Sequence, residues 1–213
     1  MSQVKLTADS GGGTVSLKGP SSTTSNGAYT LTLPGTANTT LATAADLNAL
    51  STGITEADAW RIDTDFDQQS YADITSNWAR ATWSTGSLHG YLGTGMSQSS
   101  GIFTFPSTGY WYIEGRLGYH ARTGVSSGVG LYVKGTSDGG SNYFDLVTAW
   151  DTAVFQSGYY EWGHMNCSTI IDVTSTSNCK VKFGTEASNN QVKYYSSAGG
   201  HNNLFIFIRL GDT

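Results

Sequence analysis

Short runs of alternating apolar and polar residues, separated by Pro and Gly turns, limit what this chain can fold into. The clearest case is GIFTFPSTGYWYIEGRLGYHAR (101–122), in which the turn PSTG divides two alternating runs. In the longer run, one side of an extended chain carries Trp111, Ile113, Leu117 and Tyr119, and the other side carries Tyr112, Glu114, Arg116 and His120. We therefore predict a strand with one buried face.

Similar signals recur along most of the chain. After residue 74 they return about every 8 to 15 residues, and no helical period interrupts them. This spacing is typical of a sandwich or jelly roll. Gly115 interrupts the apolar side of the long run, which indicates a bulge or a close approach by a neighbouring group. We predict an all-β fold.

A second alternating pair, STIIDVTSTSNCKVKFG (168–184), predicts a hairpin with its turn at Thr176. In that register Val173 faces Cys179. The register places Cys167 about 20 Å along the strand from the position opposite Cys179, at roughly 3.3 Å per residue, whereas a disulfide needs Cα atoms within about 7 Å. We expect two unpaired thiols that face the core.

The last run, NLFIFIRLG (203–211), is apolar on both faces. One face carries Leu204, Ile206, Ile208 and Leu210, and the other carries Phe205 and Phe207. A strand with one solvent face should alternate, so something covers the second face. We predict another subunit in that role, with an interface that includes Phe205, Phe207 and Tyr112. The alternative is coverage by residues 1–75 of the same chain.

The sequence divides into three parts. Residues 1–50 are rich in small polar residues and contain two expected short strands, 14–20 and 28–35, and a short helix near 43–50. Residues 51–76 form an irregular, acidic connector in this interpretation. Residues 77–213 form the main β domain.

Composition excludes several kinds of partner. The net charge is −5 and only 13% of residues are charged, and no basic run exists to displace counterions from a nucleic acid. No run approaches the roughly 18 apolar residues of a membrane span. The first residues also lack the pattern of a signal peptide, so we expect assembly in the cytoplasm.

The segments GIFTFPSTGYWYIEG, GLYVKG (130–135), the pair at 168–184 and NLFIFIRLG together resemble the C1q/TNF-like globular head, over residues 77–213. Three segments are more similar to the C1q-like heads of tailed-phage virion proteins, especially those of marine phages: ITEADAWRI (54–62), GTGMSQSSGIFTFPSTG (93–109) and FIRLGDT (207–213). YTLTLPGT (29–36) resembles the β-rich segments at the attachment end of phage fibres.

This resemblance implies a homotrimeric virion protein, assembled in the host cytoplasm, that is a short fibre, spike or appendage. Residues 1–50 would attach it to other virion proteins, and the C-terminal head would bind a host surface glycan or protein. The alternative is a capsid decoration protein without a receptor role. Either interpretation predicts a protein that is not an enzyme and that inserts into no membrane.

Few residues indicate chemistry. DTDFD (63–67) spaces three aspartates like the start of a calcium loop, but Gln68 and Ile74 stand where an EF-hand requires Gly and Glu. We assign no metal ligand and no cofactor, although the family resemblance leaves calcium open. GVSSG (124–128) matches the nucleophile-elbow pattern by chance, because no strand-to-helix context surrounds it.

Binding residues are predicted in the segment 141–164, which is rich in aromatic side chains beside amides and carboxylates. Such side chains supply contact area at little entropic cost. The candidates, for either partner binding or the trimer interface, are Tyr143, Trp150, Tyr159, Tyr160 and Trp162.

Overall fold

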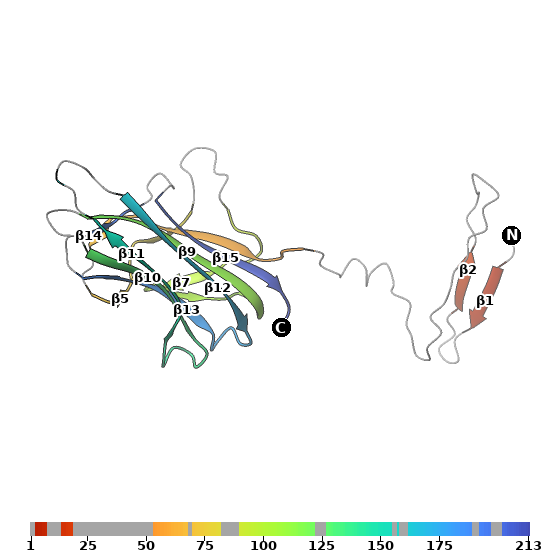
Figure 1. The fold of residues 1–213 in the computed structure, drawn as a ribbon. Coiled ribbons are helices and arrows are strands. Elements are labelled where there is room, and N and C mark those ends of the chain that lie inside the picture. The colour runs from red at the N-terminus through yellow and green to blue at the C-terminus, as the bar shows by residue number, and fades with distance from the viewer. Residues whose placement is uncertain are drawn as a thin grey trace, which may run out of the picture. The chain divides into compact units, whose positions relative to one another are not determined.

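The structure is a computed structural model of the 213-residue chain. It describes residues 3–7, 14–18, 53–67, 70–81, 90–121, 127–154, 157, 162–188, 192–196 and 202–213. The chain divides into two compact units, Met1–Leu50 and Ser51–Thr213. All regular structure in the described ranges is β (Figure 1). Those ranges contain no helix with the length and apolarity that a membrane span requires.

In the first unit, β1 (Gln3–Thr7) and β2 (Thr14–Lys18) form an antiparallel pair, with Leu6 opposite Val15. The strand predicted within 14–20 is confirmed, and its partner is a segment that the sequence analysis missed. The expected strand at 28–35 and the expected helix at 43–50 lie outside the described residues.

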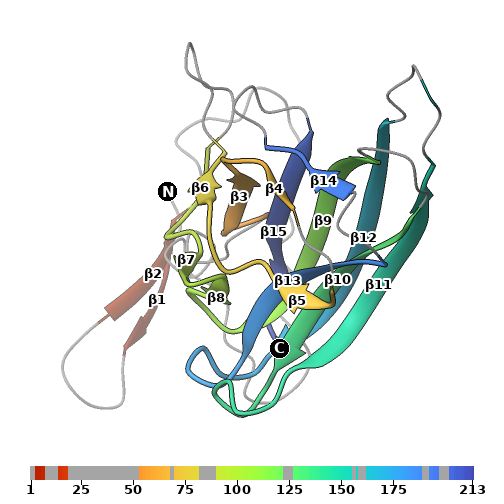
Figure 2. The same ribbon diagram turned by 90° about the vertical axis from the view of Figure 1, so that its left-hand side faces the viewer.

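The second unit is a sandwich of two antiparallel sheets. The seven-stranded sheet contains β4 (Phe66–Asp67), β14 (Val192–Tyr194), β9 (Gly109–Ala121), β15 (Asn203–Gly211), β3 (Ala57–Ile62), β6 (Trp78–Arg80) and β12 (Trp162–Val173). The six-stranded sheet contains β11 (Phe144–Ala153), β10 (Ser127–Thr136), β13 (Lys180–Ala187), β8 (Ile102–Thr104), β7 (Ser97–Ser99) and β5 (Ala72–Asp73). In Figure 2, β10, β11 and β13 cross in front of β9, β12 and β15.

Aromatic side chains from both sheets fill the space between them. The Trp78 ring lies 4.9 Å from Phe103 and 4.6 Å from Phe205, measured between ring centroids. Phe183 lies 4.6 Å from Phe205, and Phe103 lies 5.0 Å from Phe207. Most of these rings meet edge to face, the geometry that aromatic pairs favour.

The predicted alternation is confirmed from Gly109 to Leu117, but it ends there, because residues 117–121 are all buried, His120 included. Trp111, Ile113 and Leu117 on β9 are fully buried, while Tyr110 and Arg116 are exposed. Gly115 is a point of close approach, as predicted, because a Cβ atom there would lie 3.1 Å from Cε1 of Phe183 on the facing sheet.

The acidic connector proposed for residues 51–76 is corrected. This range contains β3, β4 and β5, and β3 pairs with β15 from Phe205 opposite Trp60 to Ile208 opposite Ala57. Ile62 at the end of β3 is fully buried. The acidic residues suggested a solvated linker, yet Asp58 is itself buried, where it accepts hydrogen bonds from the Trp60 indole (2.9 Å) and the Met96 amide (2.7 Å).

The hairpin predicted at 168–184 is also wrong. β12 pairs with β9, and β13 pairs with β10, so the chain crosses between the sheets at this turn. A jelly roll and a hairpin both place Val173 and Val181 in the core, so alternation could not separate them. The expectation for the two cysteines is nevertheless confirmed: Cys167 and Cys179 are buried and unpaired.

Candidate functional site

The outer face of the seven-stranded sheet carries a continuous set of aliphatic and aromatic side chains. Strand register places Ile170 on β12, Tyr112 on β9, Ile208 on β15 and Ala57 on β3 in one row across the sheet. At about 4.8 Å between strands the row spans roughly 14 Å. We call this surface the aliphatic face; it comprises Ala57, Ala59, Tyr110, Tyr112, Ile170, Leu204, Ile206, Ile208 and Leu210.

Several members of the aliphatic face are well exposed: 58% of Ile170 and 51% of Leu210 are accessible. Two carboxylates lie on this side of the sheet: Glu114, and the exposed Asp172 opposite Tyr110. The Tyr112 hydroxyl (2.9 Å) and the Asn166 amide (3.0 Å) donate hydrogen bonds to the two oxygens of Glu114. An exposed apolar patch of this kind marks an interaction surface.

Two residues predicted at a subunit interface are corrected. Phe205 and Phe207 are fully buried in the core of their own chain, because their side of β15 faces the other sheet. The reasoning that something must cover the second face of this strand still applies, but that face is the one with Leu204, Ile206, Ile208 and Leu210. Tyr112, the third predicted residue, lies on the aliphatic face.

Trp162 lies on the same side of the same sheet, at the other end of β12, and 54% of its surface is exposed. Its ring stacks on Tyr195 with 4.1 Å between centroids, and Tyr195 stacks on His120 at 4.7 Å. Sequence spacing gave no signal for this stack, because its members come from three separate segments. Tyr159 and Tyr160 lie outside the described residues.

Tyr143 and Trp150, the other two described candidates, lie against the outer side of the six-stranded sheet. Trp150 is 58% exposed, and its ring meets Tyr132 edge to face at 5.6 Å. Tyr71 meets Tyr132 in the same way at 4.7 Å. The Tyr143 ring receives the Lys182 ammonium at 3.9 Å, a cation–π contact.

Charged groups join these rings into one network. The Asp73 carboxylate forms ion pairs with the ammonium groups of Lys134 (2.6 Å between N and O) and Lys182 (3.1 Å). The Tyr71 hydroxyl donates to Asp145, and the Tyr132 hydroxyl donates to Glu186. We call this surface the aromatic face; it comprises Tyr71, Asp73, Tyr132, Lys134, Tyr143, Asp145, Trp150, Lys182 and Glu186.

The pKa values follow from these contacts. Burial raises the pKa of Tyr132, and the Glu186 carboxylate raises it further. Burial alone would raise the pKa of Asp73, but hydrogen bonds from Lys134 and Lys182 outweigh it and lower the value. Around neutral pH, the tyrosines therefore stay protonated donors and Asp73 stays an ionised acceptor.

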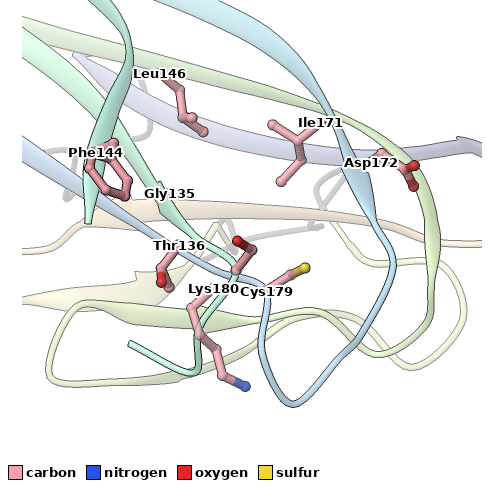
Figure 3. A pocket seen from close by; sticks show the side chains of 9 residues that line it. Gly135, Thr136, Phe144, Leu146, Ile171, Asp172, Cys179 and Lys180 are labelled. Carbon is pink, nitrogen blue, oxygen red and sulfur yellow. The ribbon is translucent and has the colours of Figure 1, made fainter. Parts of the chain in front are cut away.

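A cavity of about 210 Å³ opens where β11 and β12 flank the edge of the sandwich (Figure 3). Figure 3 shows Leu146, Ile171 and Cys179 directed into the gap, whereas the charged ends of Asp172 and Lys180 point away. Phe144 on its rim is 68% exposed. The cavity can therefore take an apolar group, and it offers few polar partners.

The aspartates of DTDFD have structural contacts. Asp63 forms an ion pair with Arg61 (2.8 Å). Asp65 forms an ion pair with Lys193 (2.9 Å) and accepts a hydrogen bond from the backbone amide of Ser196 (2.7 Å). Across the part of the chain that the structure describes, no group of three or more His, Cys, Asp or Glu side chains could hold a metal ion. Of GVSSG, only Ser127 and Gly128 are described, and they begin β10.

Comparison with known proteins supports the fold. No protein-family model matches the sequence, and no curated protein matches it. Murine APRIL at pH 8.5 is a similar solved structure, with a TM-score of 0.51, 12% identity, and coverage of 73% of this chain and 98% of APRIL. Eiger TNF from S. frugiperda has a TM-score of 0.51 and 10% identity, over 74% of this chain and 93% of Eiger. These similarities confirm an all-β, TNF-like jelly roll.

Proposed function

We propose that this chain is a tailed-phage virion protein whose second unit forms a homotrimeric head for adhesion or receptor binding at the host surface. Residues 1–50 attach it to other virion proteins. The observation that carries the proposal is the aliphatic face, an apolar surface on one side of a TNF-like jelly roll with exposed Ile170, Tyr110 and Leu210. The phage assignment depends on the sequence resemblance of residues 54–62, 93–109 and 207–213.

Two different apolar surfaces favour a ring of subunits. One is the aliphatic face, and the other is the open edge of the sandwich, where Phe144 and Leu146 are exposed. A dimer with twofold symmetry uses the same patch on both subunits, whereas two different patches generate a ring when the rotation closes. The C1q/TNF-like resemblance implies that this ring has three members.

The mechanism is multivalent presentation without catalysis. Three heads on one axis, repeated over many copies in a particle, convert weak contacts into avidity that exceeds single-site affinity by about 10² to 10⁴.

Light scattering on the purified full-length protein tests the assembly, at several concentrations and with and without a calcium chelator. We expect about three times the chain mass of 22.6 kDa at every concentration. A monodisperse monomer would overturn the proposal, and loss of the trimer in chelator would show that calcium holds the subunits together.

Labelling of particles tests the role. Antibodies against the protein should mark the tail or its appendages, and particles without the protein should adsorb poorly to cells. Labels spread over the shell, together with normal adsorption and reduced shell stability, would instead establish a capsid decoration protein.

A further inference from the structure

The two outer faces of the sandwich differ in chemistry. The outward positions of the two central strands of the six-stranded sheet contain no aliphatic side chain in their described parts: they are Gly130, Tyr132, Lys134 and Thr136 on β10, and Lys180, Lys182, Gly184 and Glu186 on β13. The aliphatic face, by contrast, carries four Leu and Ile side chains on β15 alone. The two outer faces of the sandwich therefore suit partners of different chemistry.

Two exposed rings stand on either side of a buried one. Tyr71 and Trp150 both meet Tyr132 edge to face, while Tyr132 is only 3% exposed. The buried ring and its neighbours fix the positions of the exposed rings. Rigid aromatic side chains give contact area without a large loss of conformational entropy on binding.

Fixed acceptor groups lie beside these rings. Asp145 and Glu186 each accept one tyrosine hydroxyl, and an ionised carboxylate has about four lone-pair sites, so each keeps capacity for further donors. Hydrogen bonds from neutral hydroxyls to a carboxylate are stronger than those between neutral groups. The aromatic face therefore offers apolar ring surfaces and strong acceptors side by side.

We propose that the aromatic face binds a neutral oligosaccharide, with Trp150 and Tyr71 as the rings that receive sugar units and Asp145 and Glu186 as acceptors for sugar hydroxyls. A pyranose matches this pattern because its C–H groups form an apolar face and its hydroxyl groups surround that face. This inference rests on the proposed adhesion function and names the chemical class of its receptor.

The charges favour a neutral sugar over an acidic one. The aromatic face holds three carboxylates and two ammonium groups, and both ammonium groups already contact Asp73. An incoming carboxylate or sulfate would meet excess negative charge without an available cation.

The first experiment measures binding of the purified full-length protein to a printed array of neutral and acidic bacterial polysaccharides. We expect binding to neutral polysaccharides only. Trp150→Ala should weaken that binding about tenfold or more, the loss typical of a central aromatic contact. The matched control is Tyr91→Ala, which removes a similarly exposed aromatic side chain (57%) that belongs to neither named face and should change binding less than twofold.

A conservative variant separates recognition from folding. Tyr71→Phe keeps the ring but removes the hydroxyl that donates to Asp145, so it should fold normally and bind the same polysaccharides with severalfold lower affinity. The mass of each variant by light scattering shows whether its assembly is unchanged. Failure to bind any neutral polysaccharide, exclusive binding to acidic ones, or wild-type binding by folded Trp150→Ala would overturn the inference.

A cell assay distinguishes this inference from the proposed function. Labelled protein is added to a panel of marine bacterial isolates that have been treated with periodate, which cleaves sugar diols, or with protease. Binding that periodate abolishes and protease spares would support the oligosaccharide. Binding that only protease abolishes would leave adhesion intact and overturn the oligosaccharide, and no binding to any isolate would overturn both.

Discussion

Gly115 shows how one missing side chain sets the distance between the two sheets. A Cβ atom there would lie 3.1 and 3.2 Å from two ring atoms of Phe183 and 3.5 Å from Leu131, all in the packed core. We expect Gly115→Ala to lower the free energy of unfolding by about 1–3 kcal/mol, the usual cost of overpacking. Chemical denaturation measures the change.

Gly90→Ala is the control, because a Cβ atom at Gly90 meets nothing within 4 Å. Its effect should stay within about 0.5 kcal/mol, as for most surface substitutions. Equal stability of the two variants would mean that the sheets separate at Gly115 without cost.

Asp65 gives a prediction that depends on pH. Burial alone would raise its pKa, but hydrogen bonds from Ser196 and Lys193 outweigh this and lower the pKa to about 2. In the unfolded chain an aspartate titrates near pH 4. The ionised carboxylate therefore stabilises the folded chain above about pH 4, and this contribution is lost as the pH falls from about 4 to about 2.

Asp65→Asn removes this carboxylate. The variant should be less stable than wild type at about pH 6, and the difference in free energy of unfolding should shrink towards pH 2. Asp63→Asn serves as a control, because Asp63 forms a half-exposed pair with Arg61, a type of pair that contributes little. A stability difference for Asp65→Asn that does not change with pH would contradict the assigned contacts.

At the scale of elements, β15 combines two roles on its two faces. Phe207 is fully buried between the sheets, whereas Ile208 lies beside Tyr112 and Ala57 on the aliphatic face. Phe207→Ala should cost about 3–5 kcal/mol of folding stability, as expected for a large cavity in a core. Ile208→Arg should instead give a folded monomer, because it places a charge in the centre of the proposed subunit interface.

Light scattering and chemical denaturation of both variants check this assignment. Folded protomers of Ile208→Arg with an unchanged trimer mass would show that the aliphatic face is not the interface. Full stability of Phe207→Ala would show that this side of β15 does not face the core.

The same strand shows what the sequence could and could not predict. Its double apolar pattern correctly indicated that one face lies in the core, and covering of the other face stays a prediction; the alternation of β9 correctly separated core from surface from Gly109 to Leu117. Neither pattern says which apolar face meets the other sheet, because Phe and Ile suit a core equally well. The choice depends on long-range register, here Phe207 opposite Ile113 and Asp58.

Elements that depend on partners far along the chain were missed for a similar reason. The sequence of β3 suggests an acidic linker because an aspartate such as Asp58 is usually solvated. In the fold, Asp58 is buried and accepts hydrogen bonds from the Trp60 indole and the Met96 amide. The aromatic face joins Tyr71 on the loop before β5 to side chains of β10, β11 and β13. Of the aromatic face, only Tyr143, Asp145 and Trp150 lie in the segment 141–164, where the sequence concentrates aromatic residues.

At the scale of the whole molecule, the division at residue 51 makes the covering of the aliphatic face testable. The head, Ser51–Thr213, contains both sheets of the sandwich and forms its own compact unit.

If copies of the head cover each other's aliphatic faces, the head without residues 1–50 should keep the melting temperature and the trimer state of the full chain. If residues 1–50 cover that face within each chain, their removal exposes the aliphatic row, and the shortened protein should melt at lower temperature and aggregate. Calorimetry and light scattering on the full chain and on the head, each with and without Ile208→Arg, separate these cases. If subunits share the aliphatic face, Ile208→Arg should convert both the full chain and the head from trimer to monomer. If residues 1–50 cover the face, the substitution should not have this effect.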